Sequence, residues 1–351
     1  MSDQVSPEVS TPAWRGFASD NYAGVHPEVL KALVRVNSGH QIAYGDDTIT
    51  AELQERMVAL FGREVDVYPV FNGTGANVVA LSSILRQWEA VICTSTAHVH
   101  MDEGGAPEKV AGIKLWTVPG EKGKLTPDLV RSAAHDFGFV HYAQPGAITI
   151  AQSTELGTVY TPDEVRALSE CAHELGLRVH MDGARLANAV VSLGCSVSEI
   201  TEGVDILSFG GTKNGMLMGE VIVVLNPDVV HGVEYFRKSF MQLNSKMRFA
   251  SAQMIAMLSD DLWLHSARHA NEMAQYLKER VEQIPGITIE LPVDANALFV
   301  RIPADVVERL LTKWRFYTWD GPDFVRWMCS WDTKPTDIDN FVADIEKAMA
   351  G

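Results

Sequence analysis

Short apolar runs that are typical of β-strands alternate with helical patterns over about 200 residues, and this alternation limits the folds open to the chain. The strand candidates lie at residues 90–94, 114–118, 147–152, 177–181, 204–209 and 220–225. Helical patterns such as TPDEVRALSECAHELG and ARLANAVVSLG separate several of them. This order predicts a largely parallel α/β sheet that is covered by helices on both faces.

The pattern changes near residue 229, which indicates a second structural unit. Long helical stretches there lead into the strand candidates ITIELP, ALFVRIP, WRFYTW and FVRWMCSWD and a last helix, DIDNFVADIEKAMA. We expect a mobile N-terminal arm over residues 1–16, a large α/β domain over 17–238 and a smaller α+β domain over 239–351. A length of 351 residues agrees with two domains.

The charge balance argues against several classes of partner. The chain has 29 basic and 45 acidic residues, a net charge of −16. Such a surface repels phosphate backbones, so we expect no nucleic-acid or anionic-membrane partner. A small anionic ligand would have to bind at local cations or helix N-termini. The four cysteines (Cys93, Cys171, Cys195 and Cys329) are far apart, which argues against a zinc site or disulfides. Without a leader-like N-terminus or a long apolar run, we expect a soluble, cytoplasmic protein.

The segment FNGTGAN, residues 71–77, joins a strand candidate to an apolar helix and has the composition of an anion-binding turn. Gly73 and Gly75 allow the backbone to approach a ligand, and the following helix offers free N–H groups. The segment lacks the GxGxxG spacing and the Walker lysine, which argues against dinucleotides and nucleoside triphosphates. An ordinary strand–helix turn is the alternative.

Two further polar residues follow apolar strands. Asp182 ends the strand in HMDGAR, and Lys213 lies in the glycine-rich loop SFGGTKNG. Open α/β sheets bind ligands at this carboxyl edge, although Asp182 could instead cap the helix near Ala184 and Lys213 could be a solvated loop residue. With the anion-binding turn, the two residues make the set that pyridoxal phosphate (PLP) needs. The amine binds its aldehyde, the carboxylate its pyridine nitrogen and the turn its phosphate.

On these and other motifs the chain resembles the PLP-dependent threonine aldolases of the aspartate-aminotransferase fold, PLP fold type I, and most of all the bacterial low-specificity enzymes. The motifs are FASDNYAGVHP (17–27), AYGDD (43–47), FNGTGAN, TSTAHVHMDEGGAPE, GKLTP (123–127), HMDGAR, FGGTKNG, SKMRF (245–249), RFYTW (315–319) and MCSWDT (328–333). The resemblance implies a sheet of the seven-stranded type and a homotetramer built from dimers. It also implies a lyase that cleaves L-threonine and related β-hydroxy-α-amino acids to glycine and an aldehyde.

The resemblance further implies roles for individual residues. Lys213 carries the cofactor, Asp182 binds the pyridine nitrogen, and His98, five residues before Glu103, stacks on the ring. The other implied positions are Gly73, Thr74, Gly75 and Thr212 for the phosphate, Arg185 for the cofactor O3′ and the substrate carboxylate, Ser19 and Arg326 for the substrate carboxylate, and His141 for the substrate hydroxyl. His98 or His141 would act as the base. No metal ion is implied.

Structural alternatives stand beside these roles. A histidine that follows a strand, such as His98 or His141, is more often a core or surface residue than a catalyst. Arg326 could form a buried ion pair with Asp320 or Asp323. Other functions also stay open: another fold-type-I lyase or aminotransferase, a non-catalytic PLP-binding module, or a nicotinamide dehydrogenase.

Overall fold

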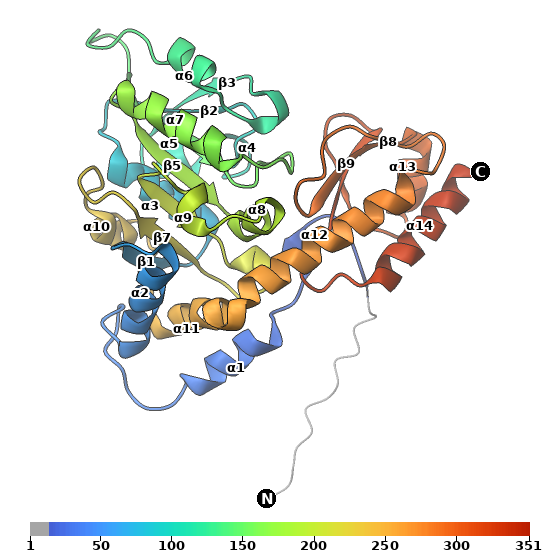
Figure 1. Ribbon diagram of the computed structural model, residues 1–351, viewed down its shortest axis with the longest axis horizontal. Helices are drawn as coiled ribbons and strands as arrows, with labels where there is room; N and C mark the ends of the chain where they lie inside the picture. Colours follow the sequence, from blue (N-terminus) through green and yellow to red (C-terminus); the bar gives the residue numbers. More distant parts are fainter. Residues whose placement is uncertain (1–13) are drawn as a thin grey trace, which may run out of the picture.

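The computed structural model describes residues 14–351 and contains two β-sheets (Figure 1). The larger sheet has seven strands in the order β1-β7-β6-β5-β4-β2-β3, and it is parallel except for β7. Its strands are β1 (Asp66–Val70), β2 (Glu89–Thr94), β3 (Lys114–Val118), β4 (Gln144–Ala151), β5 (Arg178–Gly183), β6 (Ile206–Phe209) and β7 (Glu220–Val224). The expected mostly parallel sheet is therefore confirmed.

Helices cover both faces of this sheet. Successive strand residues point to opposite sides, and the strands carry apolar residues on both sides that must be buried. Ile92, Ile148 and Leu207 belong to the core of one face, whereas their neighbours Val91 and Ala147 belong to the core of the other. The first face is covered by α1 (Pro27–Arg35), α2 (Thr48–Phe61), α6 (Pro127–Ala133), α7 (Pro162–Glu174), α8 (Leu186–Leu193), α9 (Val197–Ile200) and α11 (Arg248–Leu258). The second is covered by α3 (Gly73–Ile84), α4 (His98–Met101), α5 (Ala106–Val110) and α10 (Val233–Ser239).

The smaller sheet is antiparallel, in the order β10-β11-β9-β8, and forms a second core with the C-terminal helices. Its elements are β8 (Thr288–Ile289), β9 (Ala297–Arg301), α13 (Ala304–Leu311), β10 (Tyr317–Thr318), β11 (Phe324–Met328) and α14 (Pro335–Met349). The long helix α12 (Leu262–Val281) connects the two domains (Figure 1). Trp263 and Ala267 of α12 pack in the large core and Ala274 and Leu277 in the small one. The domains therefore meet within α12, later than the expected boundary at 238/239.

The first described segment packs against the small domain, where we had expected the large domain to begin. Phe17 stacks on Phe341 with ring centroids 4.7 Å apart, and its carbonyl accepts a hydrogen bond from the Met328 N–H at 2.8 Å. Of the expected arm, residues 1–13 lie outside the described residues, whereas Arg15 forms an ion pair with Asp332 at 2.7 Å. Within residues 14–351, no helix is long and apolar enough to span a membrane.

The segments that follow β5 and β6 approach each other closely at the carboxyl edge of the sheet. The Gly210 N–H donates to the Gly183 carbonyl at 3.1 Å, and a Cβ at Gly210 would lie 2.6 Å from the carbonyl oxygen of Ala184. Only glycine permits this approach without a backbone shift. The contact brings Asp182 and the loop of Lys213 to the same edge.

His180 on β5 links three neighbouring strands beneath that edge. Its Nδ1 lies 2.7 Å from the Thr149 hydroxyl of β4, and its Nε2 lies 3.1 Å from the Ser208 hydroxyl of β6. The ring is fully buried, and burial lowers its pKa to about 4. His180 is therefore neutral in the folded protein at neutral pH.

We expect His180 to make the fold acid-sensitive. The pKa of His180 is lower in the folded protein than in the unfolded chain. Its contribution to the free energy of unfolding is therefore complete above pH 6.5 and is lost as the pH falls towards 4. When the pH falls from 7 to 5, the unmodified protein should lose about 2 kcal/mol of its free energy of unfolding through His180. The variant His180→Gln should not show this additional loss. Urea unfolding at both pH values measures this difference. Parallel pH dependence of the two proteins would contradict a buried neutral His180.

Candidate active site

Four neighbouring strands of the large sheet each lead into a polar residue at the carboxyl edge. His98 follows β2, Glu155 follows β4, Asp182 lies in β5 and Lys213 follows β6. His98, Glu155 and Lys213 line one cavity of about 530 Å³ between the two domains. Its other lining residues are Ser19, Asn21, Ser95, Thr96, Met101, Asp102, Arg185, Tyr317, Thr318, Trp319 and Arg326. Of the eleven residues that the sequence suggested, five line this cavity: Ser19, His98, Arg185, Lys213 and Arg326.

Lys213 lies in a short 3₁₀ turn, Thr212–Asn214, that follows the glycine pair after β6. Its amine forms no ion pair within residues 14–351. Burial, and then repulsion from Arg185, lowers the pKa of Lys213 below its ordinary value. An amine with a lowered pKa is more often neutral and so more nucleophilic. The alternative of a solvated loop lysine is therefore wrong.

Asp182 is buried and accepts hydrogen bonds with both oxygens. Oδ1 accepts the Ala184 N–H at 2.9 Å, and Oδ2 accepts the side-chain amide of Asn77 at 2.8 Å. Burial alone would raise the pKa of Asp182, but the charges of His98 and Lys213 outweigh it and the pKa is lowered. The carboxylate is thus held ionised. Helix α8 begins at Leu186 with Arg185 at its cap position, so the helix-cap alternative for Asp182 is wrong.

Asn77 connects Asp182 to the histidine of the cavity. Its amide also donates to Glu103 Oε1 at 2.8 Å, and the same oxygen lies 3.0 Å from His98 Nδ1. This hydrogen bond with Glu103 raises the pKa of His98. Burial raises the pKa of Glu103. The chain Asp182–Asn77–Glu103–His98 therefore fixes the imidazole at the wall of the cavity.

The turn before α3 offers fewer donors than expected. Asn72 caps the helix, and its side-chain oxygen accepts the Gly75 N–H at 2.8 Å. The N–H groups of Gly73 and Thr74 form no hydrogen bond with the rest of residues 14–351. They lie one helical turn from Asn77, about 6 Å along the axis. The Gly75 N–H is therefore bonded within the turn, whereas those of Gly73 and Thr74 are open to an anion. The role of these three residues at the phosphate stays a prediction.

Gly75 has a different reason to be glycine. A Cβ at this position would lie 2.1 Å from the side-chain carbon Cδ of Gln242, whose oxygen accepts the Phe71 N–H at 3.0 Å. A larger residue would displace Gln242 from the turn. Thr212 is likewise engaged, because its hydroxyl donates to the Gly219 carbonyl at 3.2 Å and it does not line the cavity.

Arg185 reaches the cavity already paired with a carboxylate that the sequence analysis did not single out. Its Nε and Nη2 donate to the two oxygens of Asp20 at 2.7 and 3.0 Å. Asn296 also donates to Asp20, at 3.1 Å. Asp20 is buried, which raises its pKa, but Arg185 outweighs this effect and lowers it. Within residues 14–351, Nη1 of Arg185 forms no hydrogen bond or ion pair.

Arg326 lines the cavity without an ion pair to a carboxylate of residues 14–351. Its guanidinium lies between the rings of Tyr317 and Trp319, at 5.4 and 5.1 Å from their centroids, and Nη2 donates to the Ala18 carbonyl at 3.1 Å. Burial, and then Arg185, lowers its pKa to about 10. This backbone bond also places Arg326 beside Ser19.

The ion-pair alternative for Arg326 is wrong. Asp323 pairs instead with Arg301 at 2.8 Å, and Asp320 forms no ion pair in the described part of the chain. A buried guanidinium without a counter-ion is costly, so an anionic ligand would stabilise it.

His141 corrects the sequence-based expectation. It is exposed and precedes β4, at the amino end of the parallel strands. The length of β4, about 25 Å, separates it from the carboxyl edge where Lys213 lies. His141 therefore does not line the cavity of its own chain.

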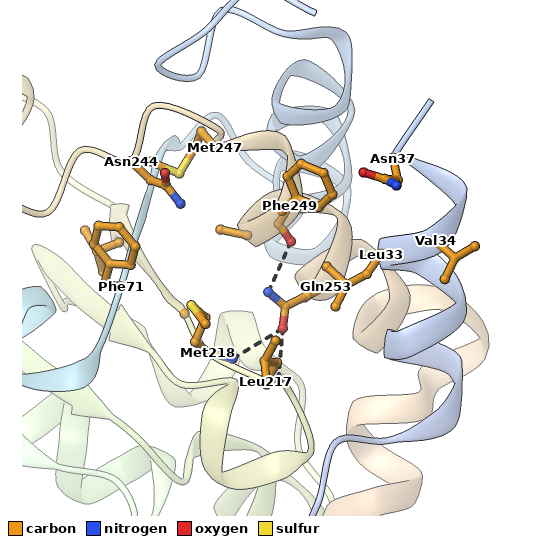
Figure 2. A pocket seen from close by; sticks show the side chains of 13 residues that line it. Leu33, Val34, Asn37, Phe71, Leu217, Met218, Asn244, Met247, Phe249 and Gln253 are labelled. Atoms are coloured by element: carbon orange, nitrogen blue, oxygen red, sulfur yellow. Dashed lines mark hydrogen bonds between the residues drawn. The ribbon is translucent and has the colours of Figure 1, made fainter. Parts of the chain in front are cut away.

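A second cavity of about 410 Å³ lies beside residues 217–219, which follow the Lys213 loop in the chain (Figure 2). It is lined by apolar residues and a few amides, without a charged side chain. Gln253 crosses its base and bonds the N–H groups of Leu217 and Met218 at 2.8 and 3.3 Å (Figure 2). This composition does not supply acid–base or nucleophilic chemistry.

Three functional candidates escaped the sequence analysis: Asn77, Asp20 and Glu155. Asn77 closes the motif FNGTGAN and Asp20 lies in FASDN, so both were within motifs that had been noted. Glu155 lies four residues after the apolar strand β4, in AQSTELG, much as Lys213 lies four residues after β6. An ionisable residue within a few positions of the carboxyl end of a parallel strand was the available signal.

Comparisons with known proteins place the chain in a family. A family model described as beta-eliminating lyase matches residues 16–305. A low specificity L-threonine aldolase from a Pseudomonas species is 46% identical over 338 residues, which cover 95% of this chain and 98% of the relative. One from Pseudomonas aeruginosa is 45% identical over 95% and 97% of the two chains. The solved structure of Leishmania major threonine aldolase superposes with a TM-score of 0.90 at 31% identity and covers 94% of this chain and 98% of that one.

We expect Asn77→Asp to destabilise the protein, because it replaces a donor with a third carboxylate. The free energy of unfolding should fall by about 3 kcal/mol at pH 8 and by less at pH 6, since only ionised carboxylates repel. Asn188→Asp is the matched control, because Asn188 is buried but bonds only to Asn271. Denaturant unfolding of both variants at the two pH values measures the effect. Equal losses in the two variants would contradict the bridging role of Asn77.

Proposed function

Because this chain belongs to the beta-eliminating lyase family, we propose that it is a PLP-dependent L-threonine aldolase. It would cleave L-threonine and related β-hydroxy-α-amino acids to glycine and an aldehyde. The observation that carries the proposal is that one cavity contains both an amine that could attach the cofactor and a guanidinium that could bind a carboxylate. Lys213 supplies a buried amine with a lowered pKa, and Arg326 supplies a guanidinium without a carboxylate partner.

The residues around the cavity fit PLP. Lys213 would attach the cofactor through its amine, and Asp182, held ionised, would bind the pyridine nitrogen. The free N–H groups of Gly73 and Thr74 would hold the phosphate at the positive end of α3. When bound, PLP supplies an electron sink for the pair released at the substrate Cα.

His98 supports this arrangement from the cavity wall. Its bond with Glu103 fixes the orientation of the imidazole, which leaves one ring face and Nε2 for the ligand. The raised pKa of His98 favours the imidazolium form, and this charge in turn keeps Asp182 ionised. We therefore propose that His98 covers the cofactor ring.

The substrate carboxylate would bind at Arg326 and Ser19. A guanidinium can grip both oxygens of a carboxylate, and this fork fixes the orientation of the amino acid. Arg185 is neutralised in part by Asp20, so it contributes through its remaining N–H groups. In a chain with a net charge of −16, these local cations give the cavity the positive charge that an anionic substrate needs.

The expected homotetramer stays a prediction. Support comes from the apolar cavity of Figure 2, whose rim includes exposed Val34, Leu217 and Met218. An apolar surface of this kind is typical of a face covered by another copy of the chain.

A product analysis tests the proposed activity. We expect the PLP-loaded protein to form glycine and an aldehyde in equal amounts from L-threonine, L-allo-threonine or phenylserine, without an added keto acid. Lys213→Ala should lose both products and the visible absorption of bound PLP, because it lacks the attaching amine. Borohydride reduction followed by peptide mapping should label Lys213. A label on Lys238 or Lys246, or a requirement for a keto acid, would refute the site or the reaction.

Arg326→Lys tests the carboxylate clamp. An ammonium cannot form the two parallel hydrogen bonds, so the binding free energy of the transition state should weaken by ~1.5–3 kcal/mol. The value of kcat/KM for L-threonine should accordingly fall by roughly 10- to 150-fold. Glycine binding should weaken in parallel, whereas PLP binding should be retained. Arg301→Lys on the neighbouring strand β9 is the matched control and should leave both unchanged. Unchanged glycine affinity in Arg326→Lys would remove Arg326 from the site.

A further inference from the structure

We propose that Glu155 accepts the proton of the substrate β-hydroxyl. The inference rests on the proposed aldolase function and names a residue for a step that His141 cannot perform within its own chain. Glu155 lines the same cavity as Lys213, Ser19 and Arg326, which are the proposed cofactor and carboxylate positions. It stands at the carboxyl edge, because the Gln152 N–H, three residues earlier, donates to the Asp182 carbonyl at 2.7 Å.

The carboxyl group of Glu155 is held in a fixed position. Its Oε1 accepts the backbone N–H of His98 at 2.7 Å, across 57 residues of sequence. Helix α4, which begins at His98, has only four residues and receives no capping bond from its own N-cap residue, Ala97. The bond therefore orients Glu155 towards the cavity wall that His98 forms.

The other ionisable groups of the cavity are less suited to this step. Arg185 and Arg326 only donate, and Lys213 is assigned to the cofactor. His98 has Nδ1 engaged by Glu103 and its ring assigned to the cofactor. Two carboxylates line the cavity, and Asp102 is the exposed one. Tyr317 is also exposed.

The protonation behaviour of Glu155 agrees with the role. Burial raises its pKa to about 7, and the nearby charge of Asp182 acts in the same direction. Near neutral pH the group is therefore present in both forms, which suits a residue that must take up a proton and release it in each turnover. The positive charges of Arg185 and His98 lie near enough to favour its ionised form.

The step is balanced without a further reactant. The O–H bond of the β-hydroxyl breaks and its proton moves to Glu155, while the oxygen electrons form the carbonyl of the departing aldehyde. The Cα–Cβ bond breaks and its electron pair stays on the Cα side. One proton then adds to Cα to give glycine, and Glu155 releases its proton to solvent or to Cα.

Glu155→Gln is the informative variant, because its amide oxygen still accepts the His98 N–H but it cannot take a proton. We measure three quantities in the PLP-loaded protein and its apo form: L-threonine cleavage, exchange of the glycine α-proton with D₂O by NMR, and PLP affinity by titration. Glycine has no β-hydroxyl, so its exchange does not need the proposed base. We expect cleavage to fall by about 100-fold or more, while exchange and PLP affinity stay within about threefold.

Glu108→Gln is the matched control, because Glu108 is exposed on α5 outside the cavity, and it should keep cleavage within about threefold. Cleavage near the unmodified level in Glu155→Gln would overturn the proposal. A joint loss of cleavage, exchange and PLP affinity would also overturn it, because it would mean that Glu155 only supports His98. Failure of the aldolase function is distinguishable, since it would be seen in the unmodified protein as glycine exchange without any aldehyde.

Discussion

The buried carboxylate of Asp182 is the constraint on which the rest of the site depends. A charge at this depth needs donors and nearby cations, and the chain supplies the Asn77 amide, the Ala184 N–H and the charges of His98 and Lys213. Each partner comes from a different element, namely α3, the turn after β5, α4 and the loop after β6. Stabilising one carboxylate therefore fixes the relative positions of four segments around the cavity.

The same demand for charge compensation separates the two arginines of the cavity. Arg185 has its counter-ion in Asp20, so its charge is compensated within the protein. Arg326 has aromatic rings and a carbonyl around it but no carboxylate within the described residues, and its pKa is lowered accordingly. The guanidinium of Arg326 is therefore open to a ligand carboxylate.

Residues of both domains line this cavity. The large sheet provides the groups for the cofactor at its carboxyl edge, and the small domain provides Arg326 on β11. The segment around Phe17 and Ser19 joins them, because it packs in the small core and then leads to Asp20 beside Arg185. The long helix α12 contributes to both cores, which couples the orientation of one domain to the other.

The sequence by itself determined the elements and most of the site. Alternating apolar strands and helices require a parallel sheet, and a parallel sheet gathers the ends of its strands at one edge, so Asp182 and Lys213 were predictable as neighbours. The tertiary structure decided what depends on packing between distant segments. The sequence does not encode locally that Asp20 neutralises Arg185, that Asn77 joins two carboxylates, that Gln242 covers Gly75 or that Glu155 holds His98. The position of His141 away from the cavity of its own chain escaped the sequence for the same reason, since a motif does not record at which end of a strand its residues lie.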